Sequence, residues 1–230
     1  MLQIRRLSLL ILVLAALAAC GTSEKPDPAK LASEGATAFD AVSAFHFKLA
    51  VTEGVSAPLG TITLINAEGD SLRPDKVSAK LKAQITGAPI AVNINGIIIG
   101  ADAWITPNPF NPTQFEQLTD TAGLENCSPA KGVSEVLRGL RNPAFVETSE
   151  VEGVKVHHIS GVVDAANLNA LTGGVATAGE LKLDLWLGVD DKLLRQLIAV
   201  GPLDPTEKPG ITRTLNLSKF NDPVTIEPPQ

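Results

Sequence analysis

The sequence predicts an α+β domain in which a large antiparallel sheet is accompanied by a few helices. Apolar and polar residues alternate along most of the chain after Phe45, whereas helical spacing is confined to three short segments. No internal repeat and no change in composition marks a second domain. Hydrophobic residues make up 44% of the 230 residues and charged residues only 19%, which excludes a disordered chain.

Charge and apolar content exclude two further classes of protein. The formal net charge is -6, whereas a nucleic-acid-binding protein needs an excess of Lys and Arg to neutralise phosphates, so no nucleic-acid partner is expected. The chain has one long apolar run, at its N-terminus, which excludes a polytopic membrane protein. Aromatic residues make up only 4%, so the remaining apolar material is almost entirely aliphatic.

The N-terminus has the organisation of a secretory signal peptide that ends in a lipidation site. Arg5 and Arg6 precede an apolar run, Leu7 to Ala19, that is shorter than the roughly 20 residues needed to cross a bilayer. The run ends in Leu17-Ala18-Ala19-Cys20-Gly21. This ending resembles the lipobox of bacterial lipoproteins, in which the Cys thiol is acylated and becomes the mature N-terminus.

These features predict the organisation of the chain. We expect residues 1–19 to be a lipoprotein signal peptide, residues 20–30 to be the lipidated Cys20 and a polar tether, and residues 31–230 to form a single domain. Two or three acyl chains hold a protein firmly at a bilayer. The domain is therefore expected outside the cytoplasm, anchored to the bacterial cell membrane through Cys20.

Three segments have helical spacing. The first, Ala29–Ala44, repeats small and apolar residues every three or four positions. The second, Ser128–Leu140, has Ser128 as its N-cap and a proline at its first helical position. The third, Asp164–Leu171, has Asp164 as its N-cap and is followed by two glycines.

Period-two alternation predicts about nine strands. The clearest is Lys76–Ile85, whose odd-numbered residues are apolar and whose even-numbered residues are Lys, Ser or Gln. Such a strand is typical of an antiparallel sheet with one wet face. The other predicted strands are Phe45–Thr52, Leu59–Asn66, Ile90–Ile94, Ile97–Ile105, Val154–Val163, Leu181–Leu187, Leu193–Val200 and Ile211–Phe220.

Residues that could carry catalysis or bind a metal do not form a recognisable constellation. If Cys20 is lipidated, Cys127 is left without a disulfide partner, and a structural thiol is expected. His46, His157 and His158 are the only histidines, and the last two are adjacent in a predicted strand, so they face opposite sides of the sheet. No metal site and no cofactor is therefore expected.

An enzymatic function is also not expected. Ser128 and Lys131 match the S-x-x-K pattern of penicillin-binding enzymes, but the S-D-N and K-T-G partners of that pattern are missing. An N-cap role explains Ser128 without catalysis. No G-x-S-x-G nucleophile elbow is present, and the carboxylates are spread along the chain.

The order of these segments resembles the LppX–LprAFG family of lipoproteins, which is related in architecture to the LolA and LolB carriers. The resemblance covers roughly Ala29 to Pro228. It rests on packing residues rather than on a catalytic motif. The matching segments are Cys20 in the lipobox, Phe45-His46-Phe47 after the first helix, the Ser128–Leu140 helix, Val151–Gly161, Leu185–Asp191 and Leu217–Val224.

The resemblance implies a strongly curved antiparallel sheet, a half-barrel, with helices on its concave face and an apolar cavity between them. Family members hold acyl chains of a lipid or glycolipid there and carry or present it. A monomer is expected, with lipid acyl chains and the membrane as its partners. The cavity lining is expected to be Val77, Ala79, Leu81, Ala83, Ile85, Ile90, Val92, Ile94, Val133, Val136, Leu137, Leu140, Leu181, Leu183, Leu185 and Leu187.

A second function fits the same sequence. A non-catalytic envelope scaffold or protein-binding lipoprotein would show the same alternating rows, because a strand packed in a solid core and one lining a cavity have the same periodicity. A carrier should contain an apolar space of several hundred cubic ångströms. A scaffold should be packed to ordinary density.

Overall fold

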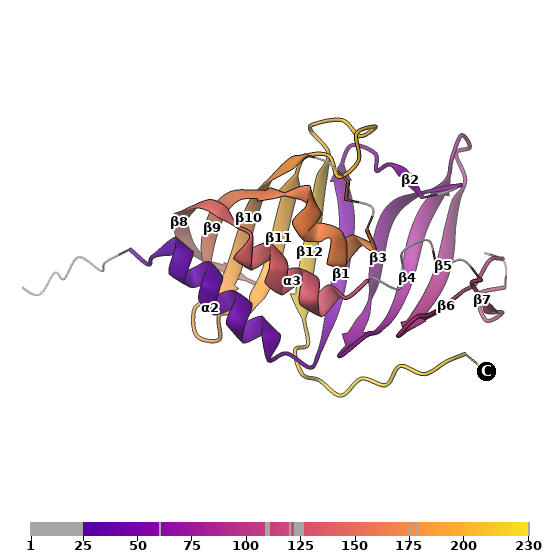
Figure 1. The fold of residues 1–230 in the computed structure, drawn as a ribbon, viewed down its shortest axis with the longest axis horizontal. Coiled ribbons are helices and arrows are strands. Elements are labelled where there is room, and N and C mark those ends of the chain that lie inside the picture. The colour runs from indigo at the N-terminus through magenta and orange to yellow at the C-terminus, as the bar shows by residue number, and fades with distance from the viewer. Residues whose placement is uncertain are drawn as a thin grey trace, which may run out of the picture.

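The computed structural model describes residues 25–229 apart from 60, 109–110, 120, 122–126, 175 and 178. Within these residues, twelve strands form one antiparallel sheet in the order β7-β6-β5-β4-β3-β1-β12-β11-β10-β9-β8, with β2 paired to β3 beside this path (Figure 1). The sheet does not close on itself, since β7 and β8 form its two edges. The predicted α+β class with a large antiparallel sheet is confirmed. The expected signal peptide and Cys20 lie outside the described residues.

The strands fall into two consecutive sets along the chain. The first set is β1 (Ala44–Glu53), β2 (Pro58–Leu59), β3 (Ile62–Leu72), β4 (Lys76–Ile85), β5 (Ala91–Ile99), β6 (Asp102–Ile105) and β7 (Glu116–Gln117). The second set is β8 (Arg141–Val151), β9 (Val154–Asp164), β10 (Glu180–Gly188), β11 (Leu194–Val200) and β12 (Thr212–Ser218). The two sets join where β1 pairs with β12, with Phe47 opposite Leu217 and Leu49 opposite Leu215.

Several strand predictions are corrected by the structure. The segment Leu59–Asn66 is divided between β2 and β3, the strand predicted to end at Ile94 continues to Ile99 as β5, and β7 was not predicted. The segment Ile97–Ile105 is not one strand: β5 ends at Ile99 and β6 begins at Asp102, because Gly100 adopts a positive φ of 60° and turns the chain. Strand β8 was not predicted. It is an edge strand whose side chains are mostly exposed, and two register irregularities and Pro143 interrupt its alternation.

The first two helices are shorter than the sequence predicts, and the third begins as a 3-10 turn. Helix α2 spans Pro28–Asp40, starting inside the expected tether, and ends before Ala44 because β1 begins there. Helix α3 spans Pro129–Arg138, and β8 follows at Arg141. The third segment is a 3-10 turn, η2 (Ala165–Leu168), followed by a short α4 (Asn169–Thr172).

The predicted N-caps are only partly right. Ser128 and Asp164 hold the N-cap positions of α3 and η2, but neither side chain makes the capping hydrogen bond. The carboxylate of Asp164 instead accepts a hydrogen bond from the Arg141 guanidinium at 2.7 Å. The Arg141 guanidinium therefore competes with the backbone N–H groups for the Asp164 carboxylate.

Asp27 is the residue that does cap a helix. Its carboxylate accepts hydrogen bonds from the backbone N–H of Ala29 at 2.9 Å and of Lys30 at 3.3 Å, at the start of α2. We expect Asp27→Ala to lower the free energy of unfolding by about 1 kcal/mol, because two N–H groups lose their acceptor. Urea unfolding measures this change. Asp27→Asn should keep most of the stability, and an equal loss in both variants would contradict the capping role.

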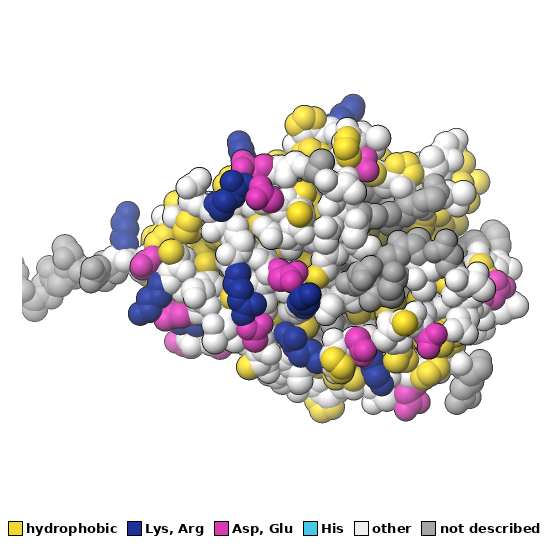
Figure 2. All heavy atoms as spheres, viewed as in Figure 1, with side chains coloured by type: hydrophobic (Ala, Val, Ile, Leu, Met, Phe, Trp, Pro, Cys, Tyr) yellow, Lys and Arg dark blue, Asp and Glu magenta, His cyan; other side chains and the backbone are white. Residues whose placement is uncertain are grey.

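Helices α2 and α3 lie on one face of the sheet, over β8–β12 and β1, and no helix of the described chain crosses β4–β6 (Figure 1). Arg73, in the β3–β4 turn, ties both helices to the sheet. Its guanidinium donates to the carbonyl oxygens of Val42 at 2.6 Å, Phe39 at 3.1 Å and Ala130 at 3.3 Å. The carboxylate of Asp40 also pairs with Arg138, which joins α2 to α3. Basic and acidic side chains lie next to one another on this helix-covered face (Figure 2).

Candidate functional site: the aliphatic concave face

One row of aliphatic side chains crosses the sheet on the face that carries the helices. The strand register places these residues opposite one another from β9 to β5. The row is Ile159, Leu185, Leu197, Leu215, Leu49, Ala67, Leu81 and Ile94. Because successive strands place these residues on the same face, the apolar surface is continuous across the junction between the two strand sets.

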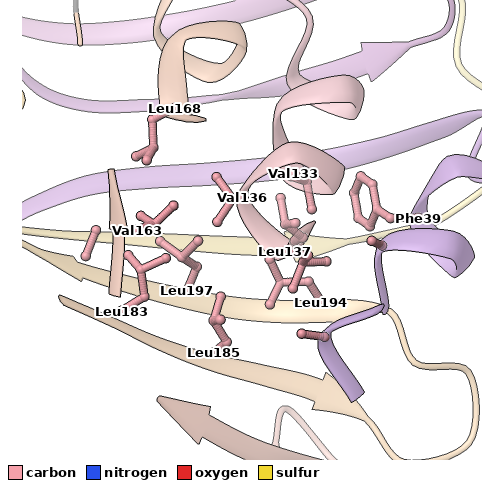
Figure 3. Close-up of a cluster of buried hydrophobic side chains, with 14 of the residues drawn as sticks. Phe39, Val133, Val136, Leu137, Val163, Leu168, Leu183, Leu185, Leu194 and Leu197 are labelled. Carbon is pink, nitrogen blue, oxygen red and sulfur yellow. The ribbon is translucent and has the colours of Figure 1, made fainter. Parts of the chain in front are cut away.

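The helix-covered half of this row is a packed core. The side chains of Ile159 and Leu185 are fully buried and that of Leu197 is 4% exposed. The predicted residues of β10 and α3 are also at most 1% exposed and share one hydrophobic cluster, while Leu140 packs against its edge (Figure 3). They are Val133, Val136, Leu137, Leu181, Leu183, Leu185 and Leu187. These side chains contact one another.

The other half of the row has a different environment. On β4 and β5, Leu81, Ile85, Val92 and Ile94 are half-buried, although they are as apolar as their counterparts under the helices. Ile90, just before β5, is 54% exposed. Partly exposed aliphatic side chains on a continuous face are the feature that needs a functional explanation.

Small residues occupy several inward positions of this half. Val77 and Ala83 are buried, and Ala79 lies between Gly69 of β3 and Gly96 of β5 in the register. A Cβ built on Gly69 would lie 2.0 Å from the carbonyl oxygen of Ser78, so only glycine fits there. The inward positions of β4 and β5 therefore combine larger aliphatic residues with Ala and Gly, and they include no ionisable group.

Neighbouring residues missed by sequence reasoning belong to the same face. Leu49 shares this face because it lies opposite both Leu215 and Ala67. Ala67 in turn lies opposite Leu81, and Ile98 lies opposite Val77. No pattern in the sequence indicates these pairings. The opposite, convex face carries the even-numbered residues of β4, which are Lys76, Ser78, Lys80, Lys82 and Gln84, as their alternation predicts.

The histidines are separated by the sheet. His158 lies on the convex side, where its Nε2 is 2.8 Å from a carboxylate oxygen of Asp184 and its ring stacks on Trp186. His157 points to the other side and lies 3.0 Å from the Thr148 hydroxyl. Burial and the positive charges of Lys192 and Lys155 lower the pKa of His157. Within the described ranges, no group of three or more His, Cys, Asp or Glu side chains is placed to hold a metal.

Cys127 and the S-x-x-K segment have structural environments. Burial raises the pKa of the Cys127 thiol to about 11, which keeps it protonated and unreactive near neutral pH. Its Sγ lies 3.9 Å from the carbonyl oxygen of Leu171. Lys131 is exposed and pairs with Glu135 at 3.4 Å, one helical turn along α3. Neither group has the surroundings of a nucleophile.

A comparison with known protein families matches residues 27–226 to the LppX_LprAFG lipoprotein model. The chain belongs to this family. The match includes every strand and helix described above. The resemblance inferred from the packing residues is therefore confirmed.

Individual relatives agree with this membership. The chain is 26% identical over 234 residues to the lipoarabinomannan carrier protein LprG of Mycobacteroides abscessus, covering 97% of both chains. Two crystal structures share its fold at low identity. LprF from Mycobacterium bovis has a TM-score of 0.66 at 16% identity, covering 90% of this chain and 99% of LprF. LppX from Mycobacterium tuberculosis has a TM-score of 0.59 at 20% identity, covering 88% of this chain and 100% of LppX.

Family membership also bears on two earlier expectations. A lipoprotein family in which a relative is named a carrier confirms that the protein is not an enzyme. It also agrees with an envelope protein held at a membrane. In the part of the chain that the structure describes, no helix is long and apolar enough to cross a bilayer.

Proposed function

We propose that this lipoprotein binds the acyl chains of a lipid or glycolipid on the open half of its concave face and carries or presents that molecule. The observation that carries the proposal is the change of environment along one aliphatic row. Helix side chains cover the row at Leu185 and Leu197, whereas Leu81 and Ile94 remain partly exposed. An acyl chain would supply the missing apolar cover.

The energetics of the open half suit such a ligand. Burying one CH2 group contributes about 0.8 kcal/mol, so one 16-carbon chain could contribute roughly 12 kcal/mol before the costs of binding. No polar anchor is needed for affinity of that size. Polar groups without partners would weaken binding. Their absence from the inward positions of β4 and β5 therefore supports the proposal.

The relatives suggest the class of ligand. Because LprG of Mycobacteroides abscessus is named a lipoarabinomannan carrier, a glycolipid is the first ligand to consider for this chain. We propose that the lipid contacts the predicted lining residues from Val77 to Ile94, which lie on β4, on β5 and in the turn between them. The expected residues of β10 and α3 would support the face from the packed half. Acylated Cys20, after loss of residues 1–19, would hold the monomeric domain at the membrane.

Lipid extraction tests the proposal directly. A Cys20→Ser chain, exported through a conventional cleavable signal, lacks only the acyl anchor and can be purified without detergent. Organic extraction and mass spectrometry should find a stoichiometric lipid with acyl chains, and a fluorescent fatty acid should exchange with it. Finding neither lipid nor exchange would reject the proposal and favour the envelope-scaffold alternative.

A further inference from the structure

Two connecting segments at one end of the open half contain no charged residue. The segments are residues 54–61, of which the structure describes all but 60, between β1 and β3, and residues 86–91, between β4 and β5. Their sequences, GVSAPLGT and TGAPIA, contain no Asp, Glu, Lys or Arg. They lie side by side: the backbone N–H of Thr86 donates to the carbonyl oxygen of Thr61 at 2.9 Å, and Ile62 is opposite Ile85. We call them the neutral tip.

The neutral tip exposes aliphatic side chains to solvent. Val55 is 72% exposed and Ile90 is 54% exposed, the two highest values for large hydrophobic residues in the described chain. Gly87 has a positive φ of 79° and open space around the position of a Cβ, as expected for the end of a tight turn. Val55 and Ile90 stand on two connecting segments at the same end of the sheet, and large exposed aliphatic side chains gathered at one end of a molecule indicate an interaction surface.

The tip is continuous with the concave face proposed to bind acyl chains. Ile62 and Ile85 are the first inward pair of β3 and β4 next to the tip, and Val92 is the first inward residue of β5. All three are half-buried. A chain moving from the tip to Ile94 would meet aliphatic side chains and no ionisable group on β4 or β5.

We propose that the neutral tip docks on a lipid bilayer surface, with Val55 and Ile90 inserted among the lipids, so that acyl chains pass between the bilayer and the concave face. A bilayer fits better than a protein partner because the tip has aliphatic side chains but no Trp, Tyr or Arg, the residues that dominate protein interfaces. The rest of the chain is acidic, with a net charge of -6, so an uncharged tip is the part that approaches an anionic leaflet with least repulsion.

The lipid-transfer role of the tip rests on the proposed function, but its docking can be tested independently. The test compares a Val55→Asp/Ile90→Asp variant with a Val146→Asp/Val154→Asp control in the anchor-free Cys20→Ser chain. Val146 and Val154 are also exposed valines, at 49% and 36%, but they lie on β8 and β9 at the opposite side of the sheet. Both variants add the same charge.

Two measurements are made with vesicles of phosphatidylcholine, with and without phosphatidylglycerol. Co-sedimentation measures docking, and the rate at which a bound fluorescent fatty acid leaves for vesicles measures transfer. The tip variant should reduce both by about tenfold or more. A Val55→Asp single variant, which leaves every residue proposed to contact the lipid intact, should reduce docking with unchanged fatty-acid affinity in vesicle-free buffer. The control should behave like the parent chain.

Other outcomes overturn the proposal. The proposal fails if the tip variant co-sediments with vesicles as much as the parent chain does, or if the control variant loses as much co-sedimentation as the tip variant. It also fails if the parent chain does not co-sediment at all. If the parent docks but binds no fatty acid, docking stands while the proposed function fails. Circular dichroism checks folding, and a Val55→Ser/Ile90→Ser variant, which should reduce docking in the same direction, replaces the aspartate variant if that does not fold.

Discussion

Replacing Glu207 with alanine is expected to lower the free energy of unfolding by about 3 to 5 kcal/mol, because it leaves the buried Arg213 guanidinium without its counter-charge. The Glu207 side chain is 2% exposed and that of Arg213 is 10% exposed. Glu207 also accepts hydrogen bonds from the backbone N–H of Ala57 and of Leu203, both at 2.8 Å. This carboxylate therefore holds the β11–β12 connection against the segment that follows β1.

Urea unfolding at neutral pH measures this loss. The exposed neighbour Lys208 provides a control, and Lys208→Ala should change the stability by less than about 0.5 kcal/mol. If Glu207→Ala unfolds at the same urea concentration as the control, the ion pair does not stabilise the fold.

The same residue makes stability depend on pH. Burial alone would raise the pKa of Glu207, but hydrogen bonds from Ala57 N–H, Arg213 and Leu203 N–H outweigh it and hold the pKa below its ordinary value of 4.5. Its stabilisation is therefore complete above that ordinary value and is lost as the pH falls through the lower folded-state pKa. In Glu207→Gln, stability should fall less steeply over this acidic range, whereas an unchanged slope would contradict the assignment.

An Ile94→Asp variant is expected to bind a fluorescent fatty acid at least about tenfold more weakly than the parent chain, because an acyl chain lying on the concave face would bury an unpaired carboxylate. Ile94 is half-buried beside Leu81 on the open half, so an aspartate there remains hydrated in the free protein. The fold should therefore survive, and the loss should appear in binding. Fluorescence titration in vesicle-free buffer measures it.

The adjacent residue gives a matched control. Asn93 lies on the same strand, is exposed, and faces the convex side, opposite Lys82. Asn93→Asp adds the same charge one residue away and should bind the fatty acid as the parent does. Equal affinities for both aspartate variants would show that the acyl chain does not lie on the concave face.

The sequence predicts the side-chain directions correctly on some strands and not on others. On β4, the alternation from Val77 to Ile85 correctly indicates which side chains share a face, because each residue step reverses the side-chain direction. On β8, the same reasoning failed because an exposed edge strand with Pro143 and two register irregularities has no regular apolar row. Leu49 and Ala67 were missed because strand pairing, rather than local pattern, places them beside Leu81.

The sequence by itself determined the α+β class, the aliphatic character of one sheet face and the packing pattern of the lipoprotein family, because periodicity and residue type are local properties. Only the tertiary structure decided that β1 pairs with β12, and that α2 and α3 lie over β10 but not over β5 (Figure 1). Leu185 and Ile94 have the same pattern in sequence. Their difference depends on contacts between segments far apart in the chain, which no local pattern encodes.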